Sequence, residues 1–483
     1  MSDGGLGPLT GGGLAGLEAR VRQDLEFLNF PPPAWIPARV TADGERVADV
    51  IVVGGGMCGL AAAFALRRRG ITNLRILDRA AAGHEGPWLS HARMETLRSP
   101  KQLTGPASGL PSLTFRAWFT AQFGGVGWDA LDKIPRPMWM DYLRWFRRVL
   151  ALPVENCVEV ARIGPDDGLI RLDLAGGARP AYTRRAILAT GRDGTGRPSV
   201  PSFLDDKIRG TSWAHAADVI DFAQLKGKRV VVIGVGSAAM DNAAEALEHG
   251  AREVRLLARR TTMPRINKLM GVGHPGFVDG FAELDEVWRW RIMHYAAQSQ
   301  TPAPHGSTLR VSRHANAFFH FDCAVCAVAA AGDGVRVTTA KGRLFDADFV
   351  IAATGFSIGV RHRPELAAVA GDIATWGDRV TAPAGCEDAE LAGYPYLGPA
   401  FAFTERQQGR APWLGRLHCF NHAASLSLGK ISGDIPAISQ GAARLAAGIA
   451  SAFYAEDIEQ HWRMLQAYEK PELIGHEWRD ADA

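Results

Sequence analysis

No uninterrupted apolar segment in this sequence reaches the ~18 residues that a membrane-crossing helix needs. The first residues also lack the basic start and apolar core of a secretory signal, since they contain Asp3 and long glycine tracts. Basic runs and basic patches with interleaved aromatic residues are absent as well, and the net charge is only +3 over 483 residues. We therefore expect a cytoplasmic protein that binds neither membranes nor nucleic acids.

Cysteine is scarce: six residues are spread along the chain, which favours a reducing compartment and free thiols. The one close pair is Cys323 and Cys326, and no second pair of this spacing accompanies it. A structural zinc site needs about four ligands. We therefore expect the two cysteines to be buried on a strand, and we expect no bound metal.

Two glycine-rich turns are present, and each lies between an apolar strand and a helix. The first spans 54–59 (Gly-Gly-Gly-Met-Cys-Gly), after a strand expected over 49–53 and before a helix expected over 60–69. The second spans 234–239 (Gly-Val-Gly-Ser-Ala-Ala), between a strand at 229–233 and a helix at 240–248. The first glycine makes the bend, the second lets backbone approach a pyrophosphate, and the third small residue lets helix and strand pack closely. These turns predict two dinucleotide sites, with contacts from Gly54, Gly56, Gly59, Gly234, Gly236, Ser237 and Ala239.

The residues after each turn predict different nucleotides. The strand at 74–77 ends in Asp78, whose carboxylate can accept hydrogen bonds from an unphosphorylated ribose, as in FAD or NAD, and Arg79 beside it is a further candidate contact. The strand at 254–257 leads instead to Arg259 and Arg260 with no acid there, which fits the 2′-phosphate of NADPH. The alternative for the two arginines is a solvated surface pair.

A repeated strand ending predicts how the chain is divided. The apolar strands at 186–191 and 349–355 both end in Ala-Thr-Gly, a small ending that lets the chain leave a sheet beside a nucleotide. We expect an α/β fold with two Rossmann-like dinucleotide-binding domains, the second inserted into a discontinuous first. The expected segments are an extension at 1–47 with a helix near 14–28, first-domain residues 48–205, a second domain at 226–345, and a return to the first domain with C-terminal helices at 346–483. The candidate contacts at the two endings are Thr190, Gly191, Thr354 and Gly355.

These features together resemble the NADPH-dependent flavin-containing monooxygenases of class B, over about 48–445. The segment 83–88 is similar to their Gly-Gly-x-Trp, and 97–102 is similar to the Asn-x-Pro-Lys-Glu stretch that lines the flavin. The resemblance implies FAD in the first site and NADPH in the second. It also implies flavin contacts from Trp88, Gly433 and Asp434, with helix N-capping as the alternative for Asp434. The implied catalytic residues are Arg98, Ser99, Lys101 and Gln102.

Two residues depart from the family pattern. Arg98 stands where the flavin-contacting asparagine would be, so the environment of the flavin need not copy that group. His215 falls one residue late in the signature before the second domain, and a satisfied histidine at a domain hinge is an equally good interpretation.

A second resemblance points to the ornithine and lysine N-hydroxylases. The stretches from Lys101 to Trp118 and from His274 to Phe281 are similar to two of their substrate-binding segments. The resemblance implies that Lys101 binds a substrate carboxylate and that Asp279 faces a cationic group. The alternative is that Lys101 contacts flavin or solvent and that Asp279 caps a helix.

The expected function is that of an NADPH-dependent FAD monooxygenase, which forms a peroxyflavin and transfers one atom of dioxygen to a small molecule. N-hydroxylation of an amine or amino-acid-like substrate is the favoured reaction, with S-oxygenation and Baeyer–Villiger oxidation as alternatives. A flavoprotein disulfide reductase is remoter, because no cysteine pair follows Asp78 closely or precedes Gly234. A non-catalytic flavin redox sensor is the last alternative. The substrate and any association into a homo-oligomer stay open.

Overall fold

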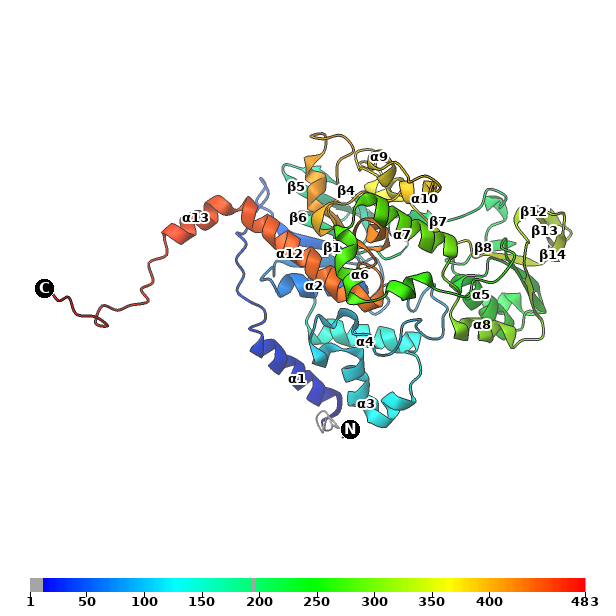
Figure 1. Ribbon diagram of the computed structural model, residues 1–483, viewed down its shortest axis with the longest axis horizontal. Helices are drawn as coiled ribbons and strands as arrows, with labels where there is room; N and C mark the ends of the chain where they lie inside the picture. The colour runs from blue at the N-terminus through cyan, green and yellow to red at the C-terminus, as the bar shows by residue number, and fades with distance from the viewer. Residues whose placement is uncertain (1–11, 193, 195, 483) are drawn as a thin grey trace.

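The computed structural model describes residues 12–192, 194 and 196–482. Figure 1 shows an α/β body with a second, smaller unit beside it at the right, which carries α5, α8 and β12–β14. In the described part of the chain no helix is long and apolar enough to cross a bilayer. No group of three or more His, Cys, Asp and Glu side chains in those residues is arranged to hold a metal ion.

The first sheet has seven strands in the order β3-β2-β1-β6-β5-β4, with β17 also paired to β6. Strands β3, β2, β1, β6 and β17 run parallel, and β4 and β5 extend the sheet as antiparallel strands. Apolar β1 is buried on both faces because helices cover it, as expected for a parallel strand. The bounds are β1 Ala48–Val53, β2 Leu74–Leu77, β3 Val154–Glu155, β4 Val160–Asp166, β5 Leu169–Leu174, β6 Ala181–Leu188 and β17 Leu417–Cys419.

Helices from distant parts of the sequence cover this sheet. The helix after the first glycine turn, α2, packs closely against α12 from the C-terminal part of the chain. The predicted helix near 14–28 is α1, which packs on α3. The bounds are α1 Gly13–Phe27, α2 Met57–Arg67, α3 Phe115–Ala130, α4 Arg136–Val149, α9 Trp376–Arg379, α10 Ala389–Ala392, α11 Ser425–Leu428, α12 Ile438–Glu456 and α13 Ile458–Gln466.

The second sheet is parallel throughout, in the order β11-β10-β9-β15-β8. A three-stranded antiparallel sheet, β12-β13-β14, lies beside it. The bounds are β8 Trp213–His215, β9 Arg229–Ile233, β10 Glu253–Leu257, β11 Ala317–His320, β12 Val325–Ala331, β13 Gly334–Thr339, β14 Leu344–Ala347, β15 Phe349–Ala352, α5 Ser237–Glu248, α6 Pro275–Gly280, α7 Glu286–Ser299 and α8 His305–Ser312.

Strand β15 lies just after residue 346, where we expected the chain to return to the first domain. It pairs with β9 on one side and β8 on the other, so both β8 and β15 belong to the second sheet although they lie outside 226–345. The chain crosses between the sheets through two short strands, β7 (Gly196–Pro198) and β16 (Phe356–Ile358), which pair with each other antiparallel. Sequence pattern alone could not assign β15, because its partners are selected by tertiary packing.

The cysteine pair is only partly as expected. Cys323 is buried just before β12, whereas Cys326 lies on β12 with an exposed side chain. The strand alternates between a packed face and a solvent face, so residues in the same segment can differ completely in burial. The expectation that both cysteines are buried is therefore wrong for Cys326.

The core of the first sheet contains a histidine that titrates abnormally. His418 on β17 is only 3 % exposed, and its Nδ1 lies 2.8 Å from the carbonyl oxygen of Ala400, to which a protonated Nδ1 can donate. Burial lowers the pKa of His418 to about 4. The folded state therefore holds the ring neutral, whereas the unfolded chain protonates it below about pH 6.5.

The free energy of unfolding is expected to fall as the pH is lowered from about 6.5 towards 4. The stabilisation is fully present above the unfolded pKa and is lost as protons bind the unfolded state. His418→Asn retains an N–H for the Ala400 carbonyl and removes the titrating ring. The free energy of unfolding of this variant should therefore decrease less than that of the wild type over this pH range, by about 3 kcal/mol at most. Denaturant unfolding of both proteins at several pH values measures the difference, and parallel curves would contradict the assignment to His418.

Candidate functional site

The first glycine turn is shaped by two close backbone approaches. Gly54 has φ +108°, and a Cβ there would lie 2.5 Å from the carbonyl oxygen of Ala189 at the end of β6. A Cβ on Gly59 would lie 1.9 Å from the carbonyl oxygen of Gly54, so α2 can approach β1 only with glycine at this position. Gly56 precedes α2 with no side-chain cap, which leaves N–H groups at the helix start for an anion.

Asp78 supports this turn from the end of β2. Its side chain is buried, its Oδ2 accepts a hydrogen bond from the Gly55 N–H at 2.7 Å, and its Oδ1 accepts one from the Ala80 N–H at 2.7 Å. Each carboxylate oxygen can accept a second hydrogen bond. Asp78 can thus position the glycine turn and still accept from a ribose hydroxyl. The neighbouring Arg79 is exposed.

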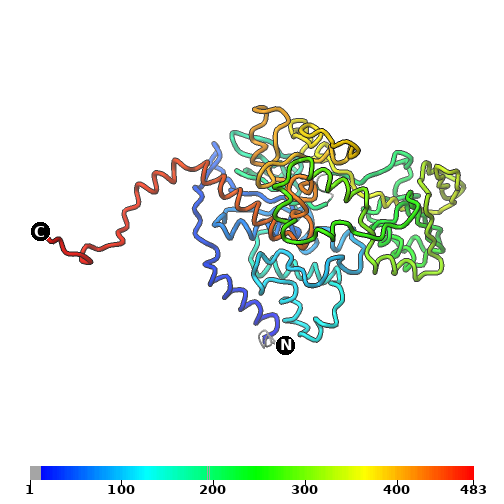
Figure 2. Tube along the Cα trace, in the orientation of Figure 1, coloured from blue at the N-terminus to red at the C-terminus, as the bar shows by residue number. Residues whose placement is uncertain are grey.

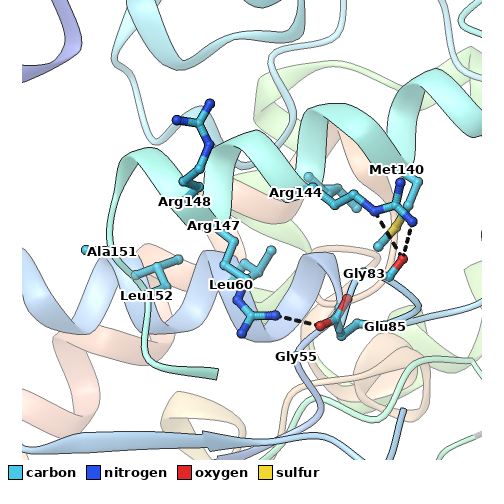
Figure 3. A pocket seen from close by; sticks show the side chains of 12 residues that line it. Gly55, Leu60, Gly83, Glu85, Met140, Arg144, Arg147, Arg148, Ala151 and Leu152 are labelled. Atoms are coloured by element: carbon cyan, nitrogen blue, oxygen red, sulfur yellow. Dashed lines mark hydrogen bonds and ion pairs between the residues drawn. The ribbon is translucent and has the colours of Figure 1, made fainter. Parts of the chain in front are cut away.

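A cavity of about 370 Å³ adjoins the same turn. Figure 3 shows it between Gly55 and α4, whose Arg144, Arg147 and Arg148 line it together with Glu85. Arg147 forms an ion pair with buried Glu85 at 2.7 Å, and Arg144 donates to the Gly83 carbonyl at 2.6 Å. The volume is within the usual range for small-molecule sites, and its lining carries more positive than negative charge. The residues present therefore fit the phosphate-bearing part of a dinucleotide.

The two segments predicted to face the flavin adjoin this turn. A Cβ on Gly56 would lie 3.6 Å from the Cα of Gly86, two residues before Trp88, and the Trp88 ring packs edge-on to Trp139 with centroids 6.3 Å apart. From the C-terminal side, the buried Ser432 carbonyl accepts a hydrogen bond from the Cys58 Sγ on α2. Trp88 and the Gly433–Asp434 segment are thus held near the first fingerprint.

Asn421 is a residue whose role the sequence analysis missed. Its fully buried side chain donates from Nδ2 to the Leu188 carbonyl at 3.2 Å and to Thr190 Oγ1 at 3.3 Å. Its own carbonyl accepts from Ser432 Oγ at 2.7 Å. Asn421 therefore connects the first Ala-Thr-Gly ending to the segment before Gly433, although these parts are more than 230 residues apart in sequence. Only its suitability as a turn and cap residue was visible in the sequence.

Asp434 makes no capping hydrogen bond to the short helix that follows it, so the N-capping alternative fails. Its carboxylate instead pairs with Lys430 at 2.8 Å. Gly433 beside it is exposed, and the neighbouring His422 has a lowered pKa because of burial and the nearby Arg192. His422 is therefore neutral at physiological pH.

The second glycine turn repeats the geometry of the first. Gly234 has φ +119°, and a Cβ there would lie 2.8 Å from the carbonyl oxygen of Ala353, the residue that matches Ala189. A Cβ on Gly236 would meet no described atom within 4 Å, so the start of α5 is open. Ala239 is fully buried at the position that matches Gly59. The repeated Ala-Thr-Gly endings, with Thr190, Gly191, Thr354 and Gly355, thus have one shared role: each places a carbonyl against its glycine turn.

The two arginines after β10 differ in their contacts. Arg260 donates from Nη2 to the Gln298 carbonyl at 2.6 Å and is half-buried. Arg259 is exposed at the end of β10, and none of the ion pairs among the described residues involves it. A guanidinium group at this place is available to a 2′-phosphate, whereas Arg260 first has to leave its carbonyl.

The side chain of Arg98, which was expected on the flavin side, reaches the second glycine turn. Its Nη2 donates to Ser237 Oγ at 3.0 Å, at the first residue of α5, and to the Pro302 carbonyl. Burial lowers the pKa of Arg98, yet the group stays cationic at physiological pH. This side chain therefore connects the segment after β2 with the crevice of the second nucleotide.

The other predicted catalytic residues do not converge on that crevice. Lys101 donates from Nζ to the carbonyls of Trp128 and Leu131, both at 2.6 Å, and to that of Asp129 at 3.4 Å. These contacts use all three N–H groups of the ammonium. Ser99 is half-buried, and Gln102 is exposed beside Lys101 at the rim of a second cavity of about 380 Å³.

Asp279 is exposed on α6, and its carbonyl accepts from Arg444 at 3.2 Å. The N-terminal cap of α6 is His274, so Asp279 does not cap this helix. His215 is buried at the end of β8, where its Nδ1 accepts from the Ala217 N–H at 3.1 Å and burial lowers its pKa. Its other ring nitrogen has no partner among the described residues.

Comparison with known proteins agrees with this geometry. The family model described as pyridine nucleotide-disulphide oxidoreductase matches residues 51–269. The FAD-dependent urate hydroxylase of Xanthomonas campestris pv. campestris is 39 % identical over 464 residues, which are 96 % of this chain and 98 % of that protein.

Solved structures are similar at the level of the fold. L-lysine 6-monooxygenase from Pseudomonas syringae matches with a TM-score of 0.63 at 19 % identity, over 84 % of this chain and 99 % of that one. The ornithine N-hydroxylase of Kutzneria sp. 744 matches with a TM-score of 0.65 at 16 % identity, again over 84 % and 99 %. The chain is 39 % identical to a flavin hydroxylase along nearly its whole length, and its two glycine turns have matching geometry. It therefore belongs to the family of class B flavin monooxygenases.

Proposed function

We propose that this enzyme is an NADPH-dependent FAD monooxygenase that hydroxylates urate or a closely related purine. The observation that carries the proposal is the 39 % identity to a urate hydroxylase over 96 % of the chain. The reaction consumes urate, dioxygen, NADPH and a proton, and it yields hydroxylated urate, NADP⁺ and water. One oxygen atom enters the substrate and the other leaves as water.

The residues divide between two cofactors. We assign the turn from Gly54 to Gly59, Asp78, Trp88 and the Gly433–Asp434 segment to FAD, and the turn from Gly234 to Ala239 with Arg259 and Arg98 to NADPH. When bound, FAD supplies the redox chemistry that accepts electrons from the nicotinamide and activates dioxygen. The protein orients both nucleotides and keeps water away from the space between them.

We also propose domain boundaries, which the strand pairing supports. We place the second domain at about 212–353, because β8 and β15 pair inside its sheet. The first domain then comprises about 48–205 and the segment from about 359 onward. The paired strands β7 and β16 form the connection between them.

N-hydroxylation of an amino-acid-like substrate is less well supported. The N-hydroxylases share only the fold with this chain, at 16–19 % identity. Lys101, the residue expected to bind a carboxylate, has its ammonium occupied by three backbone carbonyls. Asp279 is exposed and offers no buried partner for an amine.

Urate is expected to stimulate NADPH oxidation and oxygen consumption severalfold, whereas ornithine and lysine leave both at the basal rate. The measurement follows coenzyme absorbance, dissolved oxygen and urate in the same reaction, with hydrogen peroxide assayed to detect uncoupling. Equal molar consumption of urate, NADPH and dioxygen agrees with the proposal. Stimulation by an amine with none by urate would contradict it.

A further inference from the structure

The C-terminal part of the chain leaves the body as an arm. Its root is anchored, because buried Asp457 forms ion pairs with Arg184 at 2.7 Å and Arg39 at 2.6 Å. Beyond it, α13 and the segment up to Asp482 run away from the body, as Figures 1 and 2 both show. None of the residues of α13 is buried. The arm therefore has a fixed starting direction, and at its root His461 stacks on Tyr454 and lies 5.8 Å from the Trp35 ring.

The arm is apolar to an unusual degree for a solvent-exposed segment. Ile458, Trp462 and Leu465 follow the spacing of one helix face and are 48 %, 56 % and 66 % exposed. The unwound part adds Tyr468, Leu473, Ile474 and Trp478, all more than half exposed. A helix of nine residues is shorter than the ~12–15 residues needed for even marginal stability in water. Such a helix needs a surface to pack against.

A second exposed apolar surface lies on the body of the same chain. We call it the α7 surface: it comprises Ile266, Met270 and Val272 with Val287, Trp288 and Tyr295 of α7. Lys268 lies 5.9 Å from the ring centroid of Tyr295, which joins the first three residues to the helix, and Arg291 lies over Trp288 at 5.5 Å. Of 24 exposed large hydrophobic side chains in the described part of the chain, eight lie at 458–478 and six at 266–295. These two surfaces thus account for most of the exposed apolar side chains.

The arm is acidic, and two cations lie beside the aromatic rings of the α7 surface. These are Lys268 near Tyr295 and Arg291 over Trp288, although residues 266–295 as a whole contain four acids and three cations. Residues 459–482 contain six acids and three cations, so their net charge is −3. Lys268 and Arg291 of the α7 surface form none of the ion pairs found among the described residues. Opposite charges raise the association rate and disfavour wrong partners.

We propose that the C-terminal arm of one copy packs on the α7 surface of a second copy, and that the second copy returns the same contact. In Figure 1, α13 points away from α7 of its own chain, so a contact between copies satisfies both surfaces at once. Each copy supplies an arm and a receiving surface, which is the condition for a closed two-fold dimer. The apolar part of the arm, 458–478, is as long as the ~20 residues a side that a stable interface uses.

The mass of the full-length protein in solution tests this arrangement. Light scattering is expected to give about twice the chain mass of 52.0 kDa. A variant with Trp462→Glu and Leu465→Glu should have half the mass of the wild-type particle. A control with Gln460→Glu and Ala467→Glu adds the same charge to the opposite side of α13, and it should stay dimeric. Because all four side chains are exposed, circular dichroism should show that both variants remain folded.

The receiving surface is tested by exchanging charges. Lys268→Glu with Arg291→Glu should weaken the dimer, and adding Glu469→Lys with Glu472→Lys in the arm should restore it. A monomeric wild-type protein would overturn the proposal, and so would a dimer that survives the Trp462 and Leu465 changes. A dimer that needs the arm but is unaffected by the changes at Lys268 and Arg291 would overturn the α7 surface as the docking site.

Discussion

Gly59→Ala is expected to abolish flavin retention by the purified protein. The added Cβ would lie 1.9 Å from the carbonyl oxygen of Gly54, so α2 must move away from the turn that it closes. The displacement moves the N–H groups at the start of α2 away from the cofactor phosphates. Overpacking of a tight core also costs about 3 kcal/mol of stability. The ratio of flavin to protein absorbance and the thermal midpoint of the purified variant measure both effects.

The second fingerprint provides the matched control. Ala239 already carries a Cβ at the equivalent position, where its side chain is buried. Ala239→Gly should therefore cost only about 1 kcal/mol, the difference in helix propensity, and leave the flavin content unchanged. If the Gly59→Ala protein retained its full flavin content, flavin binding at the first site would not depend on the close packing of α2.

Arg259→Ala is expected to weaken NADPH binding about tenfold to a hundredfold and to leave NADH binding unchanged. A hydrogen bond to a charged group contributes about 1.5–3 kcal/mol, and about 1.4 kcal/mol corresponds to a factor of ten. Arg259 is exposed at the end of β10 and has no carboxylate partner among the described ion pairs, so its charge is available to the 2′-phosphate. Titration of each coenzyme by tryptophan fluorescence measures affinity without turnover.

Arg98→Gln is the informative comparison for this experiment. Arg98 lies on Ser237 at the start of α5, where the diphosphate common to both coenzymes is expected. Replacing Arg98 should therefore weaken the binding of NADH and of NADPH by the same factor. If Arg259→Ala also weakened the binding of both coenzymes equally, Arg259 could not be assigned to the 2′-phosphate.

The glycine turns could be predicted because their geometry is local. Strand, turn and helix follow one another within about twenty residues, and the close approaches at Gly54 and Gly59 recur wherever such a turn binds a dinucleotide. The role of Asp78 could be predicted for the same reason. Its carboxylate accepts hydrogen bonds from Gly55, which lies in the turn, and from Ala80, which lies two residues further along the chain.

The parts that the sequence could not predict depend on contacts between distant segments. Asn421 acts on residues 188–190 through side-chain hydrogen bonds, and β15 inserts between β8 and β9 only in the folded sheet. Lys101 looked free to bind a substrate, but the end of α3 and the residues after it supply three carbonyls to its ammonium. The proposed substrate corresponds to no short motif in the sequence, and the proposal rests on similarity along 96 % of the chain.

The most direct measurement of the central claim is the fate of isotopically heavy dioxygen in a reaction with urate and NADPH. If this flavin monooxygenase hydroxylates urate, mass spectrometry will find one heavy oxygen atom in the hydroxylated product, in proportion to the NADPH consumed. Product without heavy oxygen, or NADPH consumption that yields only hydrogen peroxide in the presence of urate, would contradict the account.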